Sequence, residues 1–127
     1  MDFPASLGFT GDHEWIRVEE DGVTVTVGIT DYAQGELGDI VFVELEPVDE
    51  IFEKNKTFGS VEAVKAVSDL FMPVSGTILA HNERLEDHPE LVNTDPYGEG
   101  WMIKVRLSDA EELGDLLSAE DYAAMVA

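Results

Sequence analysis

Residues 59–69 read Gly59-Ser60-Val61-Glu62-Ala63-Val64-Lys65-Ala66-Val67-Ser68-Asp69, which sets a single lysine between two strand-like runs. If both runs are β-strands, Lys65 lies at or near the tip of a hairpin and projects into solvent. Its small apolar neighbours form a tight turn and contain nothing that would trap the ammonium group. Glu62 and Asp69 flank it, but an exposed ion pair would hold it only weakly. Such a lysine suits enzymatic acylation, which replaces its charge with a long flexible arm.

Two other roles for Lys65 compete with acylation. It could be an ordinary solubilising turn residue, which is what most exposed lysines are. It could also be a Schiff-base nucleophile, but that chemistry favours a lysine removed from water in an apolar pocket. A hairpin tip flanked by acids supplies the opposite environment. Composition alone favours the solubilising residue, and the Schiff base ranks below both other roles.

Apolar residues alternate with polar ones in short runs along most of the chain, as in half-buried strands. Asp21-Gly22 adds a strong hairpin-turn signal. In the run 39–45 we expect Val41, Val43 and Leu45 to share one face. The segments expected to contain strands are 14–19, 23–29, 39–45, 52–63, 67–79 and 101–107. Many short strands separated by turns predict a mainly β fold, either a sandwich or a small barrel.

Short helices are expected at three places. Thr30 can cap a helix over residues 31–34, with Gly38 as its stop. Residues 89–92 can form one helical turn. Ser108 begins a capping-box pattern, and Ser118 begins a less ideal one, so we expect segment 108–127 to hold one broken helix or two short ones.

Composition excludes several classes of protein. Asp and Glu total 28 against 7 Lys and Arg, a net charge of −21, which argues against binding nucleic acid or an anionic membrane surface. The absence of cysteine excludes disulfides, thiolate metal sites and cysteine nucleophiles. With 127 residues, of which 44% are hydrophobic, the chain should form one folded domain.

The remaining sequence signals are negative. No apolar run approaches the roughly 20 residues of a membrane helix. The start, Met1-Asp2-Phe3-Pro4, resembles neither a secretion signal nor a transit peptide, so we expect a cytoplasmic protein, or a mitochondrial-matrix one if the chain is a processed eukaryotic product. His13, His81 and His88 lack the spacing of metal ligands, so we expect no metal site and interpret them as surface or structural residues. No catalytic pair can be named among so many carboxylates.

Several blocks of sequence, in a fixed order, carry a family resemblance. They are His13-Glu14-Trp15-Ile16, Val27-Gly28-Ile29-Thr30-Asp31-Tyr32-Ala33-Gln34, Leu37-Gly38-Asp39-Ile40-Val41-Phe42-Val43-Glu44-Leu45, Val61-Glu62-Ala63-Val64-Lys65-Ala66, Pro73-Val74-Ser75-Gly76, Pro89-Glu90-Leu91-Val92-Asn93 and Asp95-Pro96-Tyr97-Gly98-Glu99-Gly100-Trp101. Over nearly its whole length the chain thereby resembles the H-proteins of the glycine cleavage system.

The resemblance implies a fold and a cofactor. The fold is a flattened β-sandwich, the barrel-sandwich hybrid of lipoyl domains, with short helices and a C-terminal helical segment. The whole chain, 1–127, would be one lipoyl-carrier domain with its lipoyl-type core at about 23–107 and the helical segment at 108–127. The cofactor would be lipoic acid, joined to Lys65 as N6-lipoyllysine.

The same resemblance implies a carrier and not an enzyme. It would take an aminomethyl group from the pyridoxal-phosphate glycine decarboxylase (P-protein), deliver it to the aminomethyltransferase (T-protein), and pass electrons to dihydrolipoyl dehydrogenase (L-protein). Lipoylating enzymes would be further partners, and we expect a monomer. Glu14, in the matching His-Glu-Trp motif, would contact the loaded arm in a surface cleft; its alternative role is that of a surface acid at a strand edge.

Some positions depart from the family pattern. Glu62-Ala63-Val64-Lys65 stands where the family usually has Glu-Ser-Val-Lys, Asp49 replaces a turn glycine, and His81 replaces an apolar residue. Biotinyl carriers read Glu-Ala-Met-Lys-Met and the lipoyl domains of 2-oxo acid dehydrogenases read Asp-Lys-Ala at the tip. A biotinyl carrier, another lipoyl carrier and an unmodified H-like binding module therefore remain alternatives.

Overall fold

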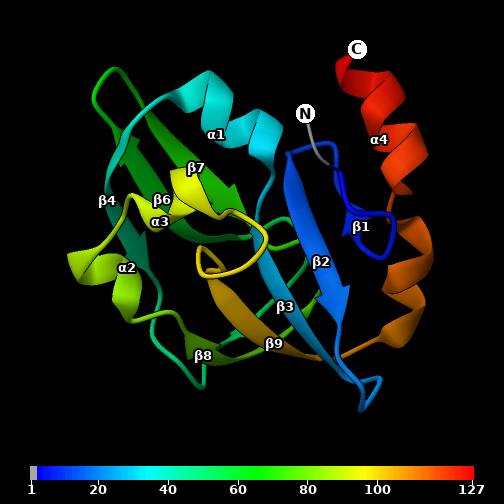
Figure 1. Ribbon diagram of the computed structural model, residues 1–127. Helices are drawn as coiled ribbons and strands as arrows, with labels where there is room; N and C mark the ends of the chain where they lie inside the picture. Colours follow the sequence, from blue (N-terminus) through cyan, green and yellow to red (C-terminus); the bar gives the residue numbers. More distant parts are fainter. Residues whose placement is uncertain (1–2) are drawn as a thin grey trace.

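The computed structural model describes residues 3–127 as two β-sheets with short helices at their edges (Figure 1). The larger sheet has the order β1-β2-β3-β9-β8-β5 and the smaller has the order β4-β6-β7. The strands of the larger sheet are β1 (Gly8–Phe9), β2 (Glu14–Val18), β3 (Thr24–Ile29), β9 (Ile103–Leu107), β8 (Gly76–His81) and β5 (Ile51–Phe52). The smaller sheet is formed by β4 (Ile40–Leu45), β6 (Thr57–Ala63) and β7 (Val67–Phe71). The mainly β sandwich expected from the strand pattern is confirmed.

The helical elements are α1 (Asp31–Leu37), α2 (Arg84–Asp87), α3 (Leu91–Thr94), the 3-10 helix η1 (Ala110–Asp115) and α4 (Ala119–Val126). Thr30 caps α1 as predicted, because its side chain accepts from the Ala33 amide, and Gly38 follows the helix at φ 80°. The C-terminal segment holds two short helices. The helical turn expected at 89–92 lies slightly later, in α3. Neither β1 nor α2 was predicted.

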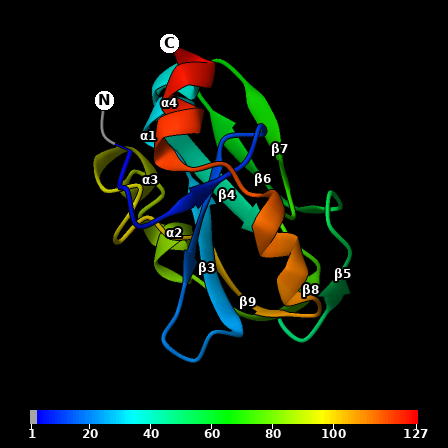
Figure 2. The same cartoon turned by 90° about the vertical axis from the view of Figure 1, so that its right-hand side faces the viewer.

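Apolar side chains from both sheets meet in one main core. The residues at its centre include Val25, Val27, Phe58, Val61, Ile78, Met102, Ile103 and Val105, all fully buried. A second, smaller cluster joins the two ends of the chain: Leu7, Phe9 and Trp15 pack with Tyr122 of α4. Figure 2 shows α4 beside β1, outside the sandwich. The terminal segments therefore have a core of their own.

Two details of the sequence pattern were wrong. Val41 does not share a face with Val43, because a register shift between Ile40 and Phe42 turns it outward, where it is 49% exposed. Ser108 does not cap a helix; Asp109 does, accepting from the Glu111 amide one residue later. In both cases the strand or helix was predicted correctly, and the error concerned the placement of a single residue in it.

Asp49, at the position where a turn glycine was expected from the family pattern, adopts a positive φ. Its φ is 69°, in the left-handed region that asparagine and aspartate tolerate better than most residues. Its amide donates to the Ile78 carbonyl oxygen at 2.7 Å. The turn after β4 is therefore compatible with aspartate and still joined to the larger sheet.

Gly28 is a close-packing position, because the Trp15 indole lies where a side chain would begin. A Cβ at Gly28 would be 2.7 Å from Trp15 Nε1, and that nitrogen donates to the Pro96 carbonyl oxygen at 2.9 Å. We expect Gly28→Ala to lower the free energy of unfolding by about 1–3 kcal/mol, since overpacking a fixed core costs that much. Chemical denaturation followed by tryptophan fluorescence measures the change.

The matched control is Gly35→Ala, in the exposed part of α1 with no atom within 4 Å of the added carbon. Alanine should stabilise this helix by about 0.5–1 kcal/mol. Equal effects of the two substitutions would contradict the close-packing explanation.

Candidate functional site

The lysine singled out by the sequence lies at the tip of the β6–β7 hairpin. Glu62 pairs with Val67, and the Ala63 amide donates to the Ala66 carbonyl oxygen at 2.7 Å, which leaves Val64 and Lys65 at the bend. The Val64 amide donates to the Asp39 carbonyl oxygen at 3.2 Å and so fixes the tip against the start of β4. The predicted placement of Lys65 at a hairpin tip is confirmed.

The tip is open to solvent. Lys65 is exposed, and its neighbours Val64 and Val67 are 77% and 64% exposed. Within residues 3–127 the Lys65 ammonium forms no ion pair, so neither flanking acid holds it. Another protein can therefore reach the amine without displacing a partner of the lysine.

The Lys65 side chain lies over the end of α1. Its Cε is 3.7 Å from the point where a Cβ of Gly38 would be, and Gly38 is the residue at which α1 ends. The amine end of the side chain therefore lies beside the C-terminal end of α1. Figures 1 and 2 place α1, α4 and the β6–β7 turn at the same end of the molecule.

A cleft of about 240 Å³ lies between α1 and β7. Its lining combines an apolar surface with polar groups. The apolar residues are Ile29, Ala33, Leu37, Val61 and Leu70, and the polar ones are Asp12, His13, Tyr32, Glu36, Ser68 and Asp69. Three carboxylates and no lysine or arginine line this cleft, so its potential favours a cation.

Glu14 lies at the start of β2, next in the chain to His13, which lines the cleft. Its side chain is 2% exposed, which rules out the alternative of a surface acid. One carboxyl oxygen, Oε1, accepts from Thr10 Oγ1 at 2.9 Å, and Oε2 accepts from the Phe71 amide at the end of β7 at 3.0 Å. Burial outweighs both hydrogen bonds and raises the pKa of Glu14 to about 8. Glu14 does not line the cleft itself; it lines a neighbouring cavity of about 340 Å³ that shares Asp12 with it.

Several cleft residues were not singled out from the sequence. Asp12 and His13 adjoin Glu14 in the chain, and His13 had been assigned no role beyond a surface or structural one. Tyr32 and Glu36 come from α1. Their only sequence signal was the helical spacing that places residues 32, 33, 36 and 37 on one face.

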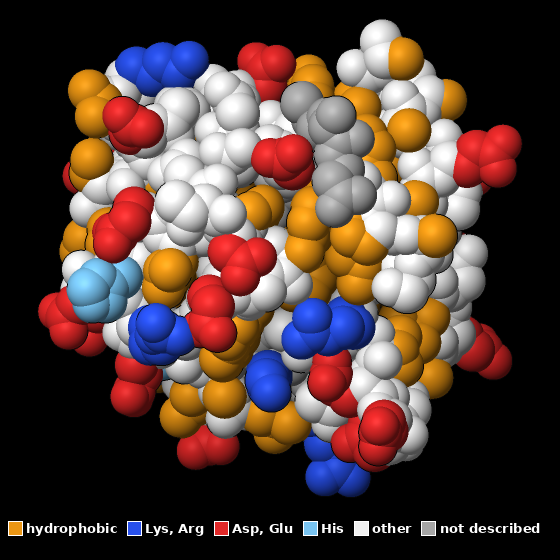
Figure 3. All heavy atoms as spheres, viewed as in Figure 1, with side chains coloured by type: hydrophobic (Ala, Val, Ile, Leu, Met, Phe, Trp, Pro, Cys, Tyr) orange, Lys and Arg blue, Asp and Glu red, His pale blue; other side chains and the backbone are white. Residues whose placement is uncertain are grey.

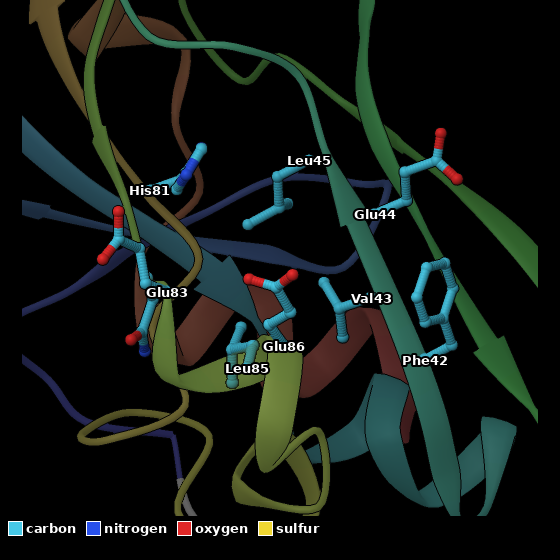
Figure 4. A pocket seen from close by; sticks show the side chains of 9 residues that line it. Phe42, Val43, Glu44, Leu45, His81, Glu83, Leu85 and Glu86 are labelled. Atoms are coloured by element: carbon cyan, nitrogen blue, oxygen red, sulfur yellow. The ribbon is translucent and has the colours of Figure 1, made fainter.

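Another hollow, of about 240 Å³, lies between β4 and α2 (Figure 4). Glu83 and Glu86 lie on its α2 side, and Val43 belongs to β4. His81 also lines it and lies 3.4 Å from the Glu46 carbonyl oxygen. No residue of the hairpin tip lines it, so it is separate from the lysine cleft.

Residues 3–127 contain no cluster of histidine and acidic side chains that could hold a metal ion. None of the helices in the described part of the chain is long and apolar enough to cross a membrane.

Comparison with known proteins assigns this arrangement to a family. The family model described as "Glycine cleavage H-protein" matches residues 7–127. The chain belongs to the glycine cleavage H-protein family. The glycine cleavage system H protein of Bacteroides thetaiotaomicron is 58% identical over 126 residues, covering 99% of this chain and 98% of that protein. That of Salinibacter ruber is 58% identical over 123 residues, covering 97% and 98%.

A solved structure supports the fold. The crystal structure of a glycine cleavage system H protein from Mycobacterium marinum superposes with a TM-score of 0.89 at 40% identity, covering 98% of each chain. Members of this family carry a lipoyl group and act as the carrier subunit of the glycine cleavage system. This chain has that carrier role, and the lipoyl-type sandwich predicted for it is confirmed.

The buried Glu14 carboxyl gives a prediction about stability and pH. In the unfolded chain it loses its proton near pH 4.5, and in the folded protein near pH 8. Between these values the folded state binds more protons, so its contribution to the free energy of unfolding falls as pH rises. We expect wild-type protein to lose on the order of a few kcal/mol relative to Glu14→Gln between pH 5 and pH 8.5.

Glutamine reproduces the neutral acid, with one acceptor and one donor, and cannot ionise. Urea unfolding at a series of pH values measures the difference. Glu44→Gln, at an exposed carboxylate of β4, is the matched control and should run parallel to wild type. A parallel curve for Glu14→Gln would contradict the buried acid.

Proposed function

We propose that Lys65 bears the lipoyl group in amide linkage, and that the cleft between α1 and β7 receives the resulting arm. The observation that carries this proposal is the direction of the Lys65 side chain. Lys65 is exposed for the modifying enzyme, yet its Cε lies over Gly38, beside the helix that forms one wall of the cleft. A strand rises about 3.4 Å per residue, so an arm folded back along β7 passes Ser68 and Asp69 within about 14 Å of the tip.

The residues of the cleft fit such an arm. Its acyl chain and disulfide ring are apolar, and the Ile29, Leu37 and Leu70 side chains offer them an apolar surface. The aminomethyl cargo carries an amine, and the carboxylates of Asp12 and Asp69 offer it negative charge. These residues would keep the amine protonated and partly shielded from water.

The lipoyl group, when bound, supplies a disulfide that can take up the aminomethyl group and two electrons. The polypeptide itself supplies exposure, tethering and shielding, so it acts as a carrier and not as a catalyst. A tethered arm makes successive transfers local, because the effective concentration of the arm near each partner is high. The partners are the P-protein, the T-protein, the L-protein and the lipoylating enzymes.

Further parts of the proposal concern the state of the protein. The whole chain, 1–127, acts as one monomeric lipoyl-carrier domain, with its core at about 23–107 and a helical segment at 108–127. It works in the cytoplasm, or in the mitochondrial matrix if it is a processed eukaryotic chain. The strongly negative net charge, −21, argues against nucleic-acid and membrane partners.

The attachment site is tested by intact mass after co-expression with a lipoylating enzyme. We expect one lipoyl increment on wild-type protein and none on Lys65→Arg, because arginine offers no acylatable amine. Lys54→Arg is the matched control and should retain the increment. A mass increase equal to biotin would instead support the biotinyl carrier. No mass increase with a competent lipoylating enzyme present would contradict the carrier proposal.

We propose that Glu14 stabilises the loaded arm from the neighbouring cavity, which shares Asp12 with the cleft. A cation seated near Asp12 would favour the ionised form of Glu14, which adds a buried negative charge. Glu14→Gln should therefore shorten the time for which lipoylated protein retains its aminomethyl group by about tenfold, since a lost charge-assisted interaction costs about 1.5 kcal/mol.

Release of formaldehyde from the isolated loaded protein measures this lifetime. Glu44→Gln removes an exposed carboxylate that lines neither the cleft nor its neighbouring cavity and should leave the lifetime unchanged. If Glu14→Gln also leaves it unchanged, Glu14 has no part in holding the arm.

A further inference from the structure

Tyr122 of α4 is a buried tyrosine that nothing in the carrier role accounts for. Its ring stacks on Phe9 with centroids 4.9 Å apart, and Phe3 packs edge-on at 5.1 Å. Its hydroxyl lies 2.8 Å from His13 Nδ1 and 2.7 Å from Thr30 Oγ1. A single hydroxyl group thus joins the C-terminal helix to a residue of the cleft and to the cap of α1.

The donor and acceptor roles of Thr30 Oγ1, the Tyr122 hydroxyl and His13 Nδ1 depend on one another. Thr30 Oγ1 already accepts from the Ala33 amide at 3.1 Å, so its own proton is available to the Tyr122 oxygen. In the arrangement in which Thr30 donates to Tyr122, the Tyr122 hydroxyl donates to His13 Nδ1. Burial raises the pKa of Tyr122, so the hydroxyl keeps the proton that it donates. A neutral His13 that accepts at Nδ1 carries its proton on Nε2.

The backbone of His13 is held on both sides. Its amide donates to the Thr10 carbonyl oxygen at 3.1 Å, and its carbonyl oxygen accepts from the Thr30 amide at 3.0 Å. Its φ is 68°, in the left-handed region, which histidine adopts more often than most residues. The ring also contacts Tyr32 at a centroid distance of 5.1 Å. Rotation of the imidazole is the freedom that remains, and the Tyr122 hydroxyl selects among its orientations.

His13 is one of the residues that line the cleft, and within the described residues its Nε2 has no hydrogen-bond partner. The acidic residues of the lining are Asp12, Glu36 and Asp69, whose carboxylates are acceptors. An Nε2–H group would therefore add a donor among acceptors. Such a donor suits the sulfur end of an arm, which accepts hydrogen bonds and lacks a donor when it is a disulfide.

We propose that Tyr122 is a positioning residue, whose hydroxyl fixes the His13 ring so that Nε2–H faces the cleft and donates to the sulfur end of the arm. This inference rests on the proposed function, in which the arm enters the cleft. It gives the C-terminal helix a role at the site, although no residue of α4 lines the cleft.

The first test does not need the lipoyl group. Long-range proton–nitrogen NMR of ¹⁵N-histidine protein, unlipoylated and at a pH where His13 is neutral, shows which nitrogen carries the proton. We expect Nε2–H in wild-type protein and a mixture of both tautomers in Tyr122→Phe. A proton on Nδ1 in wild-type protein overturns the inference, as does an unchanged tautomer in a folded Tyr122→Phe.

The second test uses lipoylated protein. A soluble phosphine reduces the arm disulfide, and the rate reports how often the arm is out of the cleft. Tyr122→Phe should raise the rate about fivefold, since a neutral hydrogen bond contributes about 1 kcal/mol. Tyr97→Phe is the matched control: it loses a hydroxyl that accepts from the Asp31 amide, without touching His13. An unchanged rate in Tyr122→Phe overturns the contact with the arm.

Ser68→Phe separates this inference from the proposed function. Ser68 lines the cleft on β7, so a larger side chain there should displace the arm and raise the reduction rate. If Ser68→Phe raises the rate and Tyr122→Phe does not, only the positioning role fails. If neither substitution raises the reduction rate, the arm does not occupy the cleft. The placement of the arm in the cleft under the proposed function is then wrong as well.

Discussion

The β4-β6-β7 ladder is the constraint on which the rest of the site depends. β6 is its central strand and pairs on both sides, so the position of the tip is set by two registers rather than one. Gly59 makes the first of these pairings possible, because a Cβ there would lie against the Glu44 carbonyl oxygen. The Val64 amide adds a bond to the Asp39 carbonyl oxygen beyond the ladder. Lys65 is thus held on a rigid bend while its side chain remains free.

Charge acts at two levels in this molecule. Acidic side chains are scattered over the face seen in Figure 3, with several Lys and Arg side chains among them in its lower half, and the whole chain has a net charge of −21. Such a surface keeps the protein dispersed and can steer it toward basic partners. The buried Glu14 differs from the surface carboxylates, because burial raises its pKa to about 8 and keeps it protonated near neutral pH. The surface carboxylates give the protein a negative electrostatic potential near neutral pH. The protonation state of the buried Glu14 depends instead on a charge placed beside it.

The sequence predicted the strands, the α1 cap and the hairpin tip, because these depend on local periodicity and turn chemistry. It failed where the decisive partner is distant in the chain. The outward turn of Val41 depends on a bulge against β6, and the cleft depends on α1 packing near β7. The two oxygens of Glu14 find Thr10 and Phe71, the second 57 residues away. Family resemblance could name Glu14, but only the fold shows that it is buried and lines a cavity next to the cleft.

The segments outside the sandwich explain why the cleft between α1 and β7 has a polar edge. The loop between β1 and β2 brings Asp12 and His13 to the edge of the cleft. The strands on either side of this loop contribute to the small aromatic core that includes Tyr122. Trp15 belongs to the same core and rests on Gly28 of β3. A two-sheet sandwich alone would present the lysine on an open surface. The packing of both chain ends against one edge places the polar residues Asp12 and His13 at the cleft, where the arm proposed for Lys65 would meet them.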